Sequence, residues 1–434
     1  MGIDIGSTTS HAMFARLRLQ RLADSLSSRY VVVERLVLHR SPIVLTPYAE
    51  GQTIDRAALE ERIAGWYRDA GLAREDVDTG AVILTGAALE RQNAHELADL
   101  FAGEGGKFVC ASAGHSLEAT LAAHGSGSVA RSRRDRSTIL HLDIGGGTTK
   151  LARIEDGVIV ATTAIAVGAR LIAFDEHGRI VRREPTAGAF GVPVTLGGLL
   201  TGEQRERIAA GMAAAIVAAA RGAAVPAQLQ LLPPLQRASA PARITLSGGV
   251  SEYLGGAGRA VDDDLGRELA RAIDGRRDRL PAPLEVSPDG IRATVIGASQ
   301  FTVQVSGSTI GLGAALPQRN VPVVPLGSPI AAGPGALALA VRWTGEPDHA
   351  RIRALGEQIV QATDRRPLIV AIDGDVAATL GAILRDELHF PGELITLDGL
   401  DLGDLDYIDI GLPVPPSGVV PVVVKSLVFP AGGL

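Results

Sequence analysis

The stretch HLDIGGGTTK, residues 141–150, decides the fold, because most of it occurs twice in this chain. Residues 2–11 read GIDIGSTTSH, so in both places Asp-Ile-Gly is followed by small residues and two threonines. Each copy follows a short apolar run that predicts a strand, and glycine permits the tight turn that comes next. Two such turns, each led by an aspartate, predict two arms of the protein that reach toward one ligand.

The sequences beyond these turns also match in pairs, in the same order along the chain. Each turn opens a predicted three-stranded meander, and the second meander contains a hairpin turn at Asp156-Gly157. VILTGAALE (82–90) matches ITLSGGVSE (244–252), and both predict a buried strand, a hydroxyl residue, a glycine and a helix start. Residues 107–125 and 292–307 then each predict a strand followed by a helix of small residues. These ordered pairs predict an internal duplication, with two mixed sheets that face each other across a cleft.

Composition excludes several classes of protein. The formal net charge of −6 argues against nucleic-acid binding. Cys110 is the only cysteine, and the nine histidines show no His-x-x-x-His spacing, so a disulfide framework and a protein metal site of this kind are not expected. The apolar run 208–220 is too short to cross a membrane and predicts a buried helix. We therefore expect a cytosolic protein that binds no membrane.

Two local features also lead to expectations. The basic run ARSRRDRS (130–137) predicts a solvated linker more readily than an anion site. The first predicted strand begins almost at Met1, so either the natural chain starts upstream or this strand is short and frays.

The residue types in the turns suit magnesium and a triphosphate. Amides in a glycine turn converge on an anion, and hydroxyl groups add donors. Asp4 and Asp143 stand at strand ends, where a carboxylate can hold magnesium directly or through water. A glycine pair before a helix suits the close passage of ribose or adenine. The predicted nucleotide ligands are Gly6, Ser7, Thr8, Thr9, Gly145, Gly146, Gly147, Thr148, Thr149, Gly248, Gly249 and Ser251.

Each turn taken singly is more simply explained as a β-turn. In the same way, Asp373-Gly374-Asp375 is more simply a helix-capping turn than an acidic site. The pairing of the Asp-Ile-Gly turns across a duplication nevertheless favours nucleotide binding.

Several stretches resemble known motifs. DIGSTT, DIGGGTTKLA and ITLSGGVSE resemble the first phosphate, second phosphate and adenosine motifs of the actin–hexokinase–Hsp70 ATPase superfamily. The units at 107–125 and 292–307 resemble its two connecting elements. More narrowly, the chain resembles the EutA family, the reactivating factors of ethanolamine ammonia-lyase. The stretches that carry this resemblance include HRSPIVLTPY, LTGAALERQNA, SAGHSLEATLAAHGSGS and DYIDIGLPVPPSGVVPVVVKSLVF.

This resemblance implies an α/β fold with two duplicated actin-like ATPase domains around a nucleotide cleft. The expected ranges are 1–136 and 137–308 for these domains and 309–434 for a C-terminal α/β region. The resemblance also implies a factor that uses ATP and Mg²⁺ to release damaged cobalamin from adenosylcobalamin-dependent ethanolamine ammonia-lyase. Asp4 and Asp143 would hold the metal, and Glu118, in the first connecting helix, is the candidate general base. A homodimer and an association with a bacterial microcompartment are left open.

The C-terminal region predicts alternating strands and helices, with strands at 336–343, 367–373 and 393–397 and helices at 349–364 and 376–386. Every phosphate and adenosine motif precedes residue 320, so this region is expected to serve a partner more than the nucleotide. Two rival functions remain, a small-molecule kinase on the same fold and a scaffold that binds nucleotide without hydrolysing it.

Overall fold

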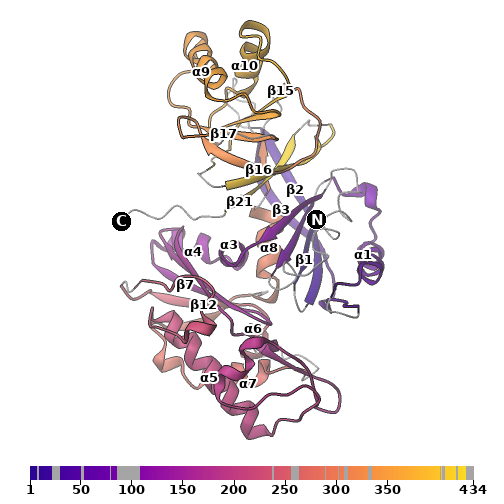
Figure 1. Cartoon of the computed structure of the whole chain (residues 1–434), viewed down its shortest axis with the longest axis vertical. Helices are drawn as coiled ribbons and strands as arrows, with labels where there is room; N and C mark the ends of the chain where they lie inside the picture. Colours follow the sequence, from indigo (N-terminus) through magenta and orange to yellow (C-terminus); the bar gives the residue numbers. More distant parts are fainter. Residues whose placement is uncertain are drawn as a thin grey trace.

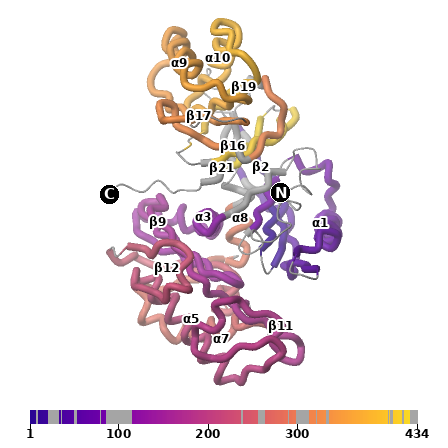
Figure 2. The backbone as a smooth tube through the Cα atoms, viewed as in Figure 1, coloured from indigo at the N-terminus to yellow at the C-terminus, as the bar shows by residue number. Residues whose placement is uncertain are grey.

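The computed structural model describes residues 1–6, 9–21, 30–49, 53–78, 80–85, 108–236, 239–255, 263–288, 290–301, 303–306, 311–330, 335–400, 402, 406–416 and 419–426. Three bodies of mixed α/β structure surround two central helices, α3 (His115–Gly125) and α8 (Ala293–Phe301) (Figure 1). The tube in Figure 2 follows the chain from the indigo first body to the magenta second body, and then to the orange and yellow C-terminal body at the opposite end.

The first sheet has the strand order β3-β2-β1-β5-β6. A meander of antiparallel strands, β1 to β3, is followed by β5 and β6, which run parallel to β1. Helix α1 (Arg56–Ala70) begins at an Asp55 cap and packs Leu59, Ile63 and Trp66 against this sheet. The strands are β1 (Gly2–Ile5), β2 (Thr9–Arg21), β3 (Tyr30–Arg40), β5 (Gly80–Thr85) and β6 (Phe108–Ala113), with β4 (Val44–Leu45) paired to β2.

The second sheet has the order β9-β8-β7-β12-β13, which repeats the first sheet strand for strand. Its meander contains the predicted hairpin turn, with positive φ at both Asp156 and Gly157. The predicted buried helix is α5 (Gly202–Ala220), in which Ile208, Met212 and Ile216 are fully buried. The strands are β7 (Ile139–Ile144), β8 (Thr149–Glu155), β9 (Val158–Ile165), β12 (Arg243–Ser247) and β13 (Leu284–Val286). Beside them lie α6 (Ser251–Leu254), α7 (Gly266–Asp274) and the small sheet of β10 (Ile172–Phe174) with β11 (Ile180–Arg183).

The two sheets confirm the predicted duplication and the α/β fold class with two actin-like units. In each unit the strand that ends in Asp-Ile-Gly lies at the centre of its sheet, between an antiparallel and a parallel neighbour. β1 has four residues, and all of them are buried. The two glycine turns therefore leave equivalent edges of two equivalent sheets.

Each central helix packs on the sheet of the other unit. α3 follows the first sheet in the chain but packs on β7, β8 and β9, whereas α8 follows the second sheet and packs on β1, β2 and β5. The prediction that residues 292–307 begin with a strand was wrong, because α8 occupies 293–301 and β14 (Val303–Ser306) comes after it. The β-branched run Thr294-Val295-Ile296 favours a strand locally, but close contact with α3 selects the helix.

The C-terminal sheet has the order β14-β21-β20-β16-β17-β18-β19-β15. Its parallel strands β16 to β19 are joined by α9 (His349–Ala362) and α10 (Ala377–Ala382), which pack on one face, and this confirms the predicted alternation. β14 lies within the range expected for the second domain, yet it pairs with β21. The other strands are β15 (Gly311–Leu312), β16 (Gln318–Pro325), β17 (Leu337–Val341), β18 (Leu368–Ile372), β19 (Leu394–Leu397), β20 (Asp406–Ile410) and β21 (Val420–Ser426).

Two smaller expectations need correction. The basic run 130–137 is largely exposed, as expected, but it is not a linker, because it forms most of α4 (Ser128–Asp135), in which Ser132 is fully buried. Asp373 does not cap α10; its Oδ1 accepts a hydrogen bond from the backbone N–H of Trp343 and so joins the ends of β17 and β18. Among the helices of the described residues, none combines the length and the apolar character needed to cross a membrane.

Candidate functional site

Equivalent backbone hydrogen bonds close the two Asp-Ile-Gly turns. The N–H of Gly6 donates to the carbonyl of Thr9 at 2.9 Å, and the N–H of Gly145 donates to that of Thr148 at 3.0 Å. Beyond each turn the strand register is also the same, because Asp4 lies opposite His11 and Asp143 lies opposite Lys150. The duplication therefore extends to single residues at the two strand ends. Ser7 and Thr8, predicted to bind phosphate, lie outside the described residues.

The backbone of Ala169 and Arg170 supports the second turn through two hydrogen bonds. Ala169 N–H donates to Gly145 O at 3.0 Å, and Arg170 N–H donates to Gly146 O at 2.6 Å. A Cβ on Gly168 would lie 2.4 Å from Gly146 O, so only glycine allows this approach. The Arg170 guanidinium forms a buried ion pair with Asp263 and Asp264, which ties this segment to the chain that precedes α7.

The hydroxyl groups of Thr149 and Thr46 hold the two turns in place, whereas other predicted ligands are partly exposed. Thr149 is fully buried, and its hydroxyl donates to Val167 O at 2.7 Å, so it holds the turn in place. At the first turn, Thr46 donates to Gly6 O at 2.7 Å and contacts the Ser10 hydroxyl at 2.9 Å. The predicted phosphate ligands that lie partly exposed on the turns are Gly6, Thr9, Gly145, Gly146, Gly147 and Thr148.

Gly248 brings the end of β12 against the second Asp-Ile-Gly turn. Its φ is +85°, and a Cβ there would lie 2.3 Å from Ile144 O. A Cβ on Gly249, in contrast, would meet only the Cδ1 of Ile291, at 3.9 Å. The buried Ser251 hydroxyl donates to Gly248 O at 2.6 Å and so helps to hold this turn.

Three carboxylates and one ammonium group gather near these turns. Lys150 is 7% exposed, and its ammonium group forms an ion pair with Glu118, which is 2% exposed on α3. Asp143 accepts a hydrogen bond from the Ser247 hydroxyl at 2.5 Å. The side chains come from α3, β7, β8 and β12, so this part of the site depends on the packing of α3 against the second sheet. Asp4, on β1, contributes from the first sheet.

The pKa directions describe how these groups affect one another. Burial disfavours the charged form of Lys150, but the charges of Glu118, Asp143 and Asp4 more than compensate and raise its pKa. Burial would raise the pKa of Glu118, yet Lys150 and His115 lower it to about 2. Burial raises the pKa of Asp143, although Lys150 and Ser247 act against this shift. Carboxylates from both sheets therefore act on one buried ammonium group.

A series of buried hydrogen bonds holds the Asp143 side chain in position. Because the single Ser247 proton goes to Asp143, Nε2 of His141 donates to the Ser247 oxygen, at 3.0 Å. Nδ1 of His141 then accepts from the Thr245 or Ser128 hydroxyl, at 2.9 or 3.2 Å. Burial lowers the pKa of His141 to about 3, which agrees with this neutral tautomer.

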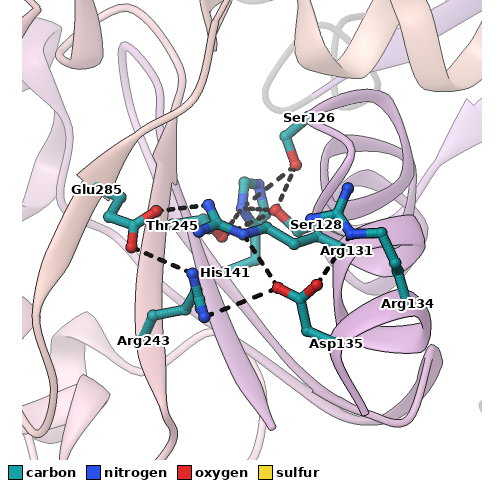
Figure 3. A network of polar contacts seen from close by, with 9 residues as sticks. All are labelled: Ser126, Ser128, Arg131, Arg134, Asp135, His141, Arg243, Thr245 and Glu285. Carbon is teal, nitrogen blue, oxygen red and sulfur yellow. Dashed lines mark hydrogen bonds and ion pairs between the residues drawn. The ribbon is translucent and has the colours of Figure 1, made fainter. Parts of the chain in front are cut away.

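Ion pairs fix α4 beside these hydrogen bonds, and Figure 3 shows the ion pairs together with Ser128, His141 and Thr245. Arg131 of α4 and Arg243 of β12 both bind Glu285 of β13, and Asp135 contacts both arginines. Ser126, next to the end of α3, contacts Nδ1 of His141 at 3.4 Å and the Ser128 hydroxyl at 2.8 Å. The position of Asp143 is therefore set by packing that includes the end of α3.

The donor set fits magnesium only when phosphate oxygens complete it. Among the described residues, no group of three or more His, Cys, Asp or Glu side chains could hold a metal by itself. Mg²⁺ usually keeps several waters and binds through one or two carboxylates plus substrate phosphates. Asp4, Glu118 and Asp143 exceed the charge of Lys150 by two when all are ionised, and one divalent cation would balance this excess.

Sequence reasoning missed the roles of Lys150, Ser247 and His141. All three lie in the quoted motifs, and Lys150 is one of only three lysines in the chain. The signal that could have identified Lys150 was its register. Two antiparallel strands joined by the Asp-Ile-Gly turn place Lys150 opposite Asp143. Its partner Glu118 could not be predicted, since α3 covers the sheet of the other unit.

Two matched sheets with equivalent carboxylates and glycine turns define an actin-like α/β protein. The family model described as "Ethanolamine utilisation protein EutA" matches residues 1–332 and 329–430, and the chain belongs to this family. The ethanolamine ammonia-lyase reactivase EutA of Escherichia coli (strain K12) is 35% identical over 99% of this chain and 98% of its own length. The protein with the same name from Salmonella typhimurium is 34% identical over the same shares. Among solved structures, the ethanolamine utilization protein EutJ from Carboxydothermus hydrogenoformans matches 69% of this chain and 88% of its own, at 17% identity and a TM-score of 0.36.

Proposed function

We propose that this protein is an ATP-dependent reactivating factor for ethanolamine ammonia-lyase. The observation that carries the nucleotide site is the repeated geometry at Asp4 and Asp143. Each aspartate ends a central strand before a glycine turn closed by the same hydrogen bond, and both aspartates raise the pKa of Lys150. The partner is proposed from the relatives, whose name describes them as reactivases of this lyase.

ATP would bind between the first and second sheets, with its phosphates on the two glycine turns. Gly146 and Gly147 are partly exposed on the second turn, and their amides suit phosphate oxygens, which accept hydrogen bonds from such turns. The nucleoside would pass Gly248 and Gly249 beside α6. ADP would leave the same place after hydrolysis.

Asp4 and Asp143 would hold Mg²⁺, largely through water. When bound, the metal ion would neutralise charge on the phosphates and help to place them for attack by water. Ser247 and His141 would keep Asp143 oriented, since their hydrogen bonds fix one of its oxygens. The protein would thus contribute mainly position and charge.

Glu118 is less suited to be the general base than its place on α3 implies. A base must accept a proton in the transition state, and a pKa near 2 makes this carboxylate a weak acceptor. We propose that Glu118 holds Lys150 and that the attacking water loses its proton late, to phosphate or solvent.

ATP binding and hydrolysis would favour one arrangement of the two units over another. The two arrangements would differ in their affinity for the lyase. A damaged cobalamin leaves only when a partner binds the open lyase more tightly than the closed lyase. The reactivating factor would supply that difference, and intact adenosylcobalamin would then enter.

The test is ammonia release by lyase inactivated with an adenosyl-lacking cobalamin, in the presence of adenosylcobalamin, ATP and Mg²⁺. We expect recovery with the wild-type protein and none without ATP. Phosphate release should be measured in parallel with the lyase absent and present, and with a panel of sugars and carboxylates. Phosphate transfer to one of these compounds without lyase recovery would identify a small-molecule kinase instead.

A further inference from the structure

Lys150 occupies an unusual place for a buried cation. It lies on β8 directly opposite Asp143, and its ammonium group is paired with Glu118 from α3. Glu118 is also 3.7 Å from Nδ1 of His115. An ammonium group thus lies beside the carboxylates that a divalent cation would need.

The equivalent residue of the first unit carries no fixed charge. By register, His11 corresponds to Lys150, and among the described residues neither of its ring nitrogens has a hydrogen-bond partner. The duplication therefore supplied two equivalent strand positions beside two aspartates, and the strand itself carries a fixed cation at only one of them; at the other, burial and the charge of Arg292, from outside the strand, lower the pKa of His11. This asymmetry makes Lys150 a feature of the site and not of the repeated fold.

We propose that Lys150 is a resident cation of the site, which offsets one of the negative charges of the carboxylates in the nucleotide-free protein and so helps to exclude divalent cations until phosphates bring further negative charge. The role as part of a nucleotide site rests on the proposed function, but the exclusion of metal does not. A unit positive charge a few ångströms from a metal position opposes metal binding, and partial burial strengthens this effect. In this arrangement the metal would enter together with the phosphates, whose negative charge offsets Lys150.

The probe is Mn²⁺, titrated into nucleotide-free protein and followed through the electron paramagnetic resonance signal of the free ion. We expect weak binding by the wild-type protein and binding at least about tenfold tighter by Lys150→Met, which removes one charge near the carboxylates. Lys150→Arg keeps the charge and should bind as weakly as the wild type. Arg277→Met removes a cation from an exposed ion pair outside the site, with Asp274, and should also leave the Mn²⁺ affinity unchanged.

Lys150→Met leaves Glu118 buried without this partner and could unfold the protein, so the comparison is repeated in the Glu118→Gln background. There the ion pair with Glu118 is already absent and Asp143 keeps the hydrogen bond from Ser247, so the change from Lys150 to Met removes a charge without leaving a buried carboxylate unpartnered. Glu118→Gln/Lys150→Met should again bind Mn²⁺ at least about tenfold more tightly than Glu118→Gln. It should also bind close to the wild-type affinity, because the net charge of the cluster is then the same.

No tightening in either background would overturn the proposal. Equal tightening by Lys150→Arg would also overturn it, since the effect would then arise from packing and not from charge. ATP binding by the wild type is measured separately. Its absence would refute the proposed function, while the Mn²⁺ comparison would still decide the role of Lys150.

Discussion

Gly125 of α3 and Gly297 of α8 lie against each other where the two central helices cross. A Cβ on Gly125 would lie 1.9 Å from Ala293 O and 2.6 Å from Gly297 N. A Cβ on Gly297 would lie 2.1 Å from Leu121 O. Each glycine therefore meets the residue four positions before the other, which is the relation expected of two equivalent helices related by the duplication.

Substitution of either glycine should separate the helices and destabilise the protein. Gly125→Ala and Gly297→Ala each place a methyl group in steric overlap with backbone atoms of the other helix. Backbone atoms cannot move aside as the end of a flexible side chain can. We expect each to lower the free energy of unfolding by at least about 2 kcal/mol, as overpacking of a close contact does. The measurement is urea unfolding followed by circular dichroism.

The matched control is Gly65→Ala in α1. A Cβ there would meet only an Arg68 side-chain nitrogen at 3.7 Å, so the change should be neutral or should stabilise by up to about 1 kcal/mol. Equal effects at all three positions would contradict the close crossing of α3 and α8.

Asp143→Asn should weaken nucleotide binding that depends on Mg²⁺ by at least about tenfold, because it removes a charge near the cation. The asparagine oxygen can still accept the Ser247 hydrogen bond, so folding should change little. The measurement is calorimetric titration with MgATP, accompanied by a thermal melt. Asp156→Asn, in an exposed hairpin turn, is the control and should bind MgATP as the wild type does. Unchanged Mg²⁺ dependence in Asp143→Asn would remove this residue from the metal site.

Gly248→Ala should lower stability rather than report on the nucleoside. Its positive φ and its contact with the Ile144 backbone both require glycine, and we expect a loss of at least about 2 kcal/mol in urea unfolding. Gly249→Val is the informative variant for the ribose, since a Cβ there meets only Ile291 at 3.9 Å. We expect a folded Gly249→Val protein with weakened ATP binding. Wild-type affinity in that protein would show that the nucleoside lies elsewhere.

Acid should destabilise this protein at a pH where carboxylates are still ionised. Burial lowers the pKa of His11 and of His141 from 6.5 to about 3. Between these values the unfolded chain binds protons that the native protein does not bind, so stability falls as the pH decreases below 6.5. Each histidine contributes up to about 1.4 kcal/mol per pH unit.

Urea unfolding at about pH 7 and about pH 5 measures this slope. His11→Gln should remove roughly half of the part due to the two histidines. His177→Gln should leave the slope unchanged, because the side chain of His177 is 75% exposed. A slope that is the same in His11→Gln and in the wild type would contradict a neutral, buried His11.

Local patterns were enough to predict the duplication, the meanders, the Asp156-Gly157 hairpin and the alternation of the C-terminal region. Each depends on side-chain periodicity or turn chemistry within a few residues. The same patterns failed where distant packing decides. Thr294-Val295-Ile296 favours a strand in isolation but lies in α8, and most of the basic run at 130–137 lies in α4, which the Arg131–Glu285 ion pair ties to β13.

For the site, the aspartates and glycines could be proposed from repetition, but their partners could not. Lys150 meets Glu118 only because α3 crosses to the other sheet, and no spacing in the chain encodes that crossing. Gly248 was expected to make room for a ribose, whereas its φ and the nearby Ile144 backbone already require glycine.

The C-terminal sheet should not be removable without damage to the rest of the protein. β21 pairs with β14, and Val423 of β21 is buried with Ile83 of β5 and with Leu117 and Leu121 of α3. Truncation after about residue 320 would thus leave β14 unpaired and expose apolar side chains on the helix that carries Glu118. We therefore expect such a truncation to weaken nucleotide binding, although every phosphate and adenosine motif precedes residue 320.

Val423→Ala tests this connection without truncation. We expect a loss of about 2 kcal/mol in urea unfolding, as for removal of methyl groups from a packed cluster, and Val423→Asp should lose more because it buries a carboxylate. Val360→Ala, at a 38% exposed position on α9, should change stability by less than about 0.5 kcal/mol. The decisive readout is MgATP affinity in a folded Val423→Asp protein. Weakened affinity would show that the C-terminal sheet supports α3 and, through Glu118, the site; wild-type affinity would show that the first two sheets hold the site without it.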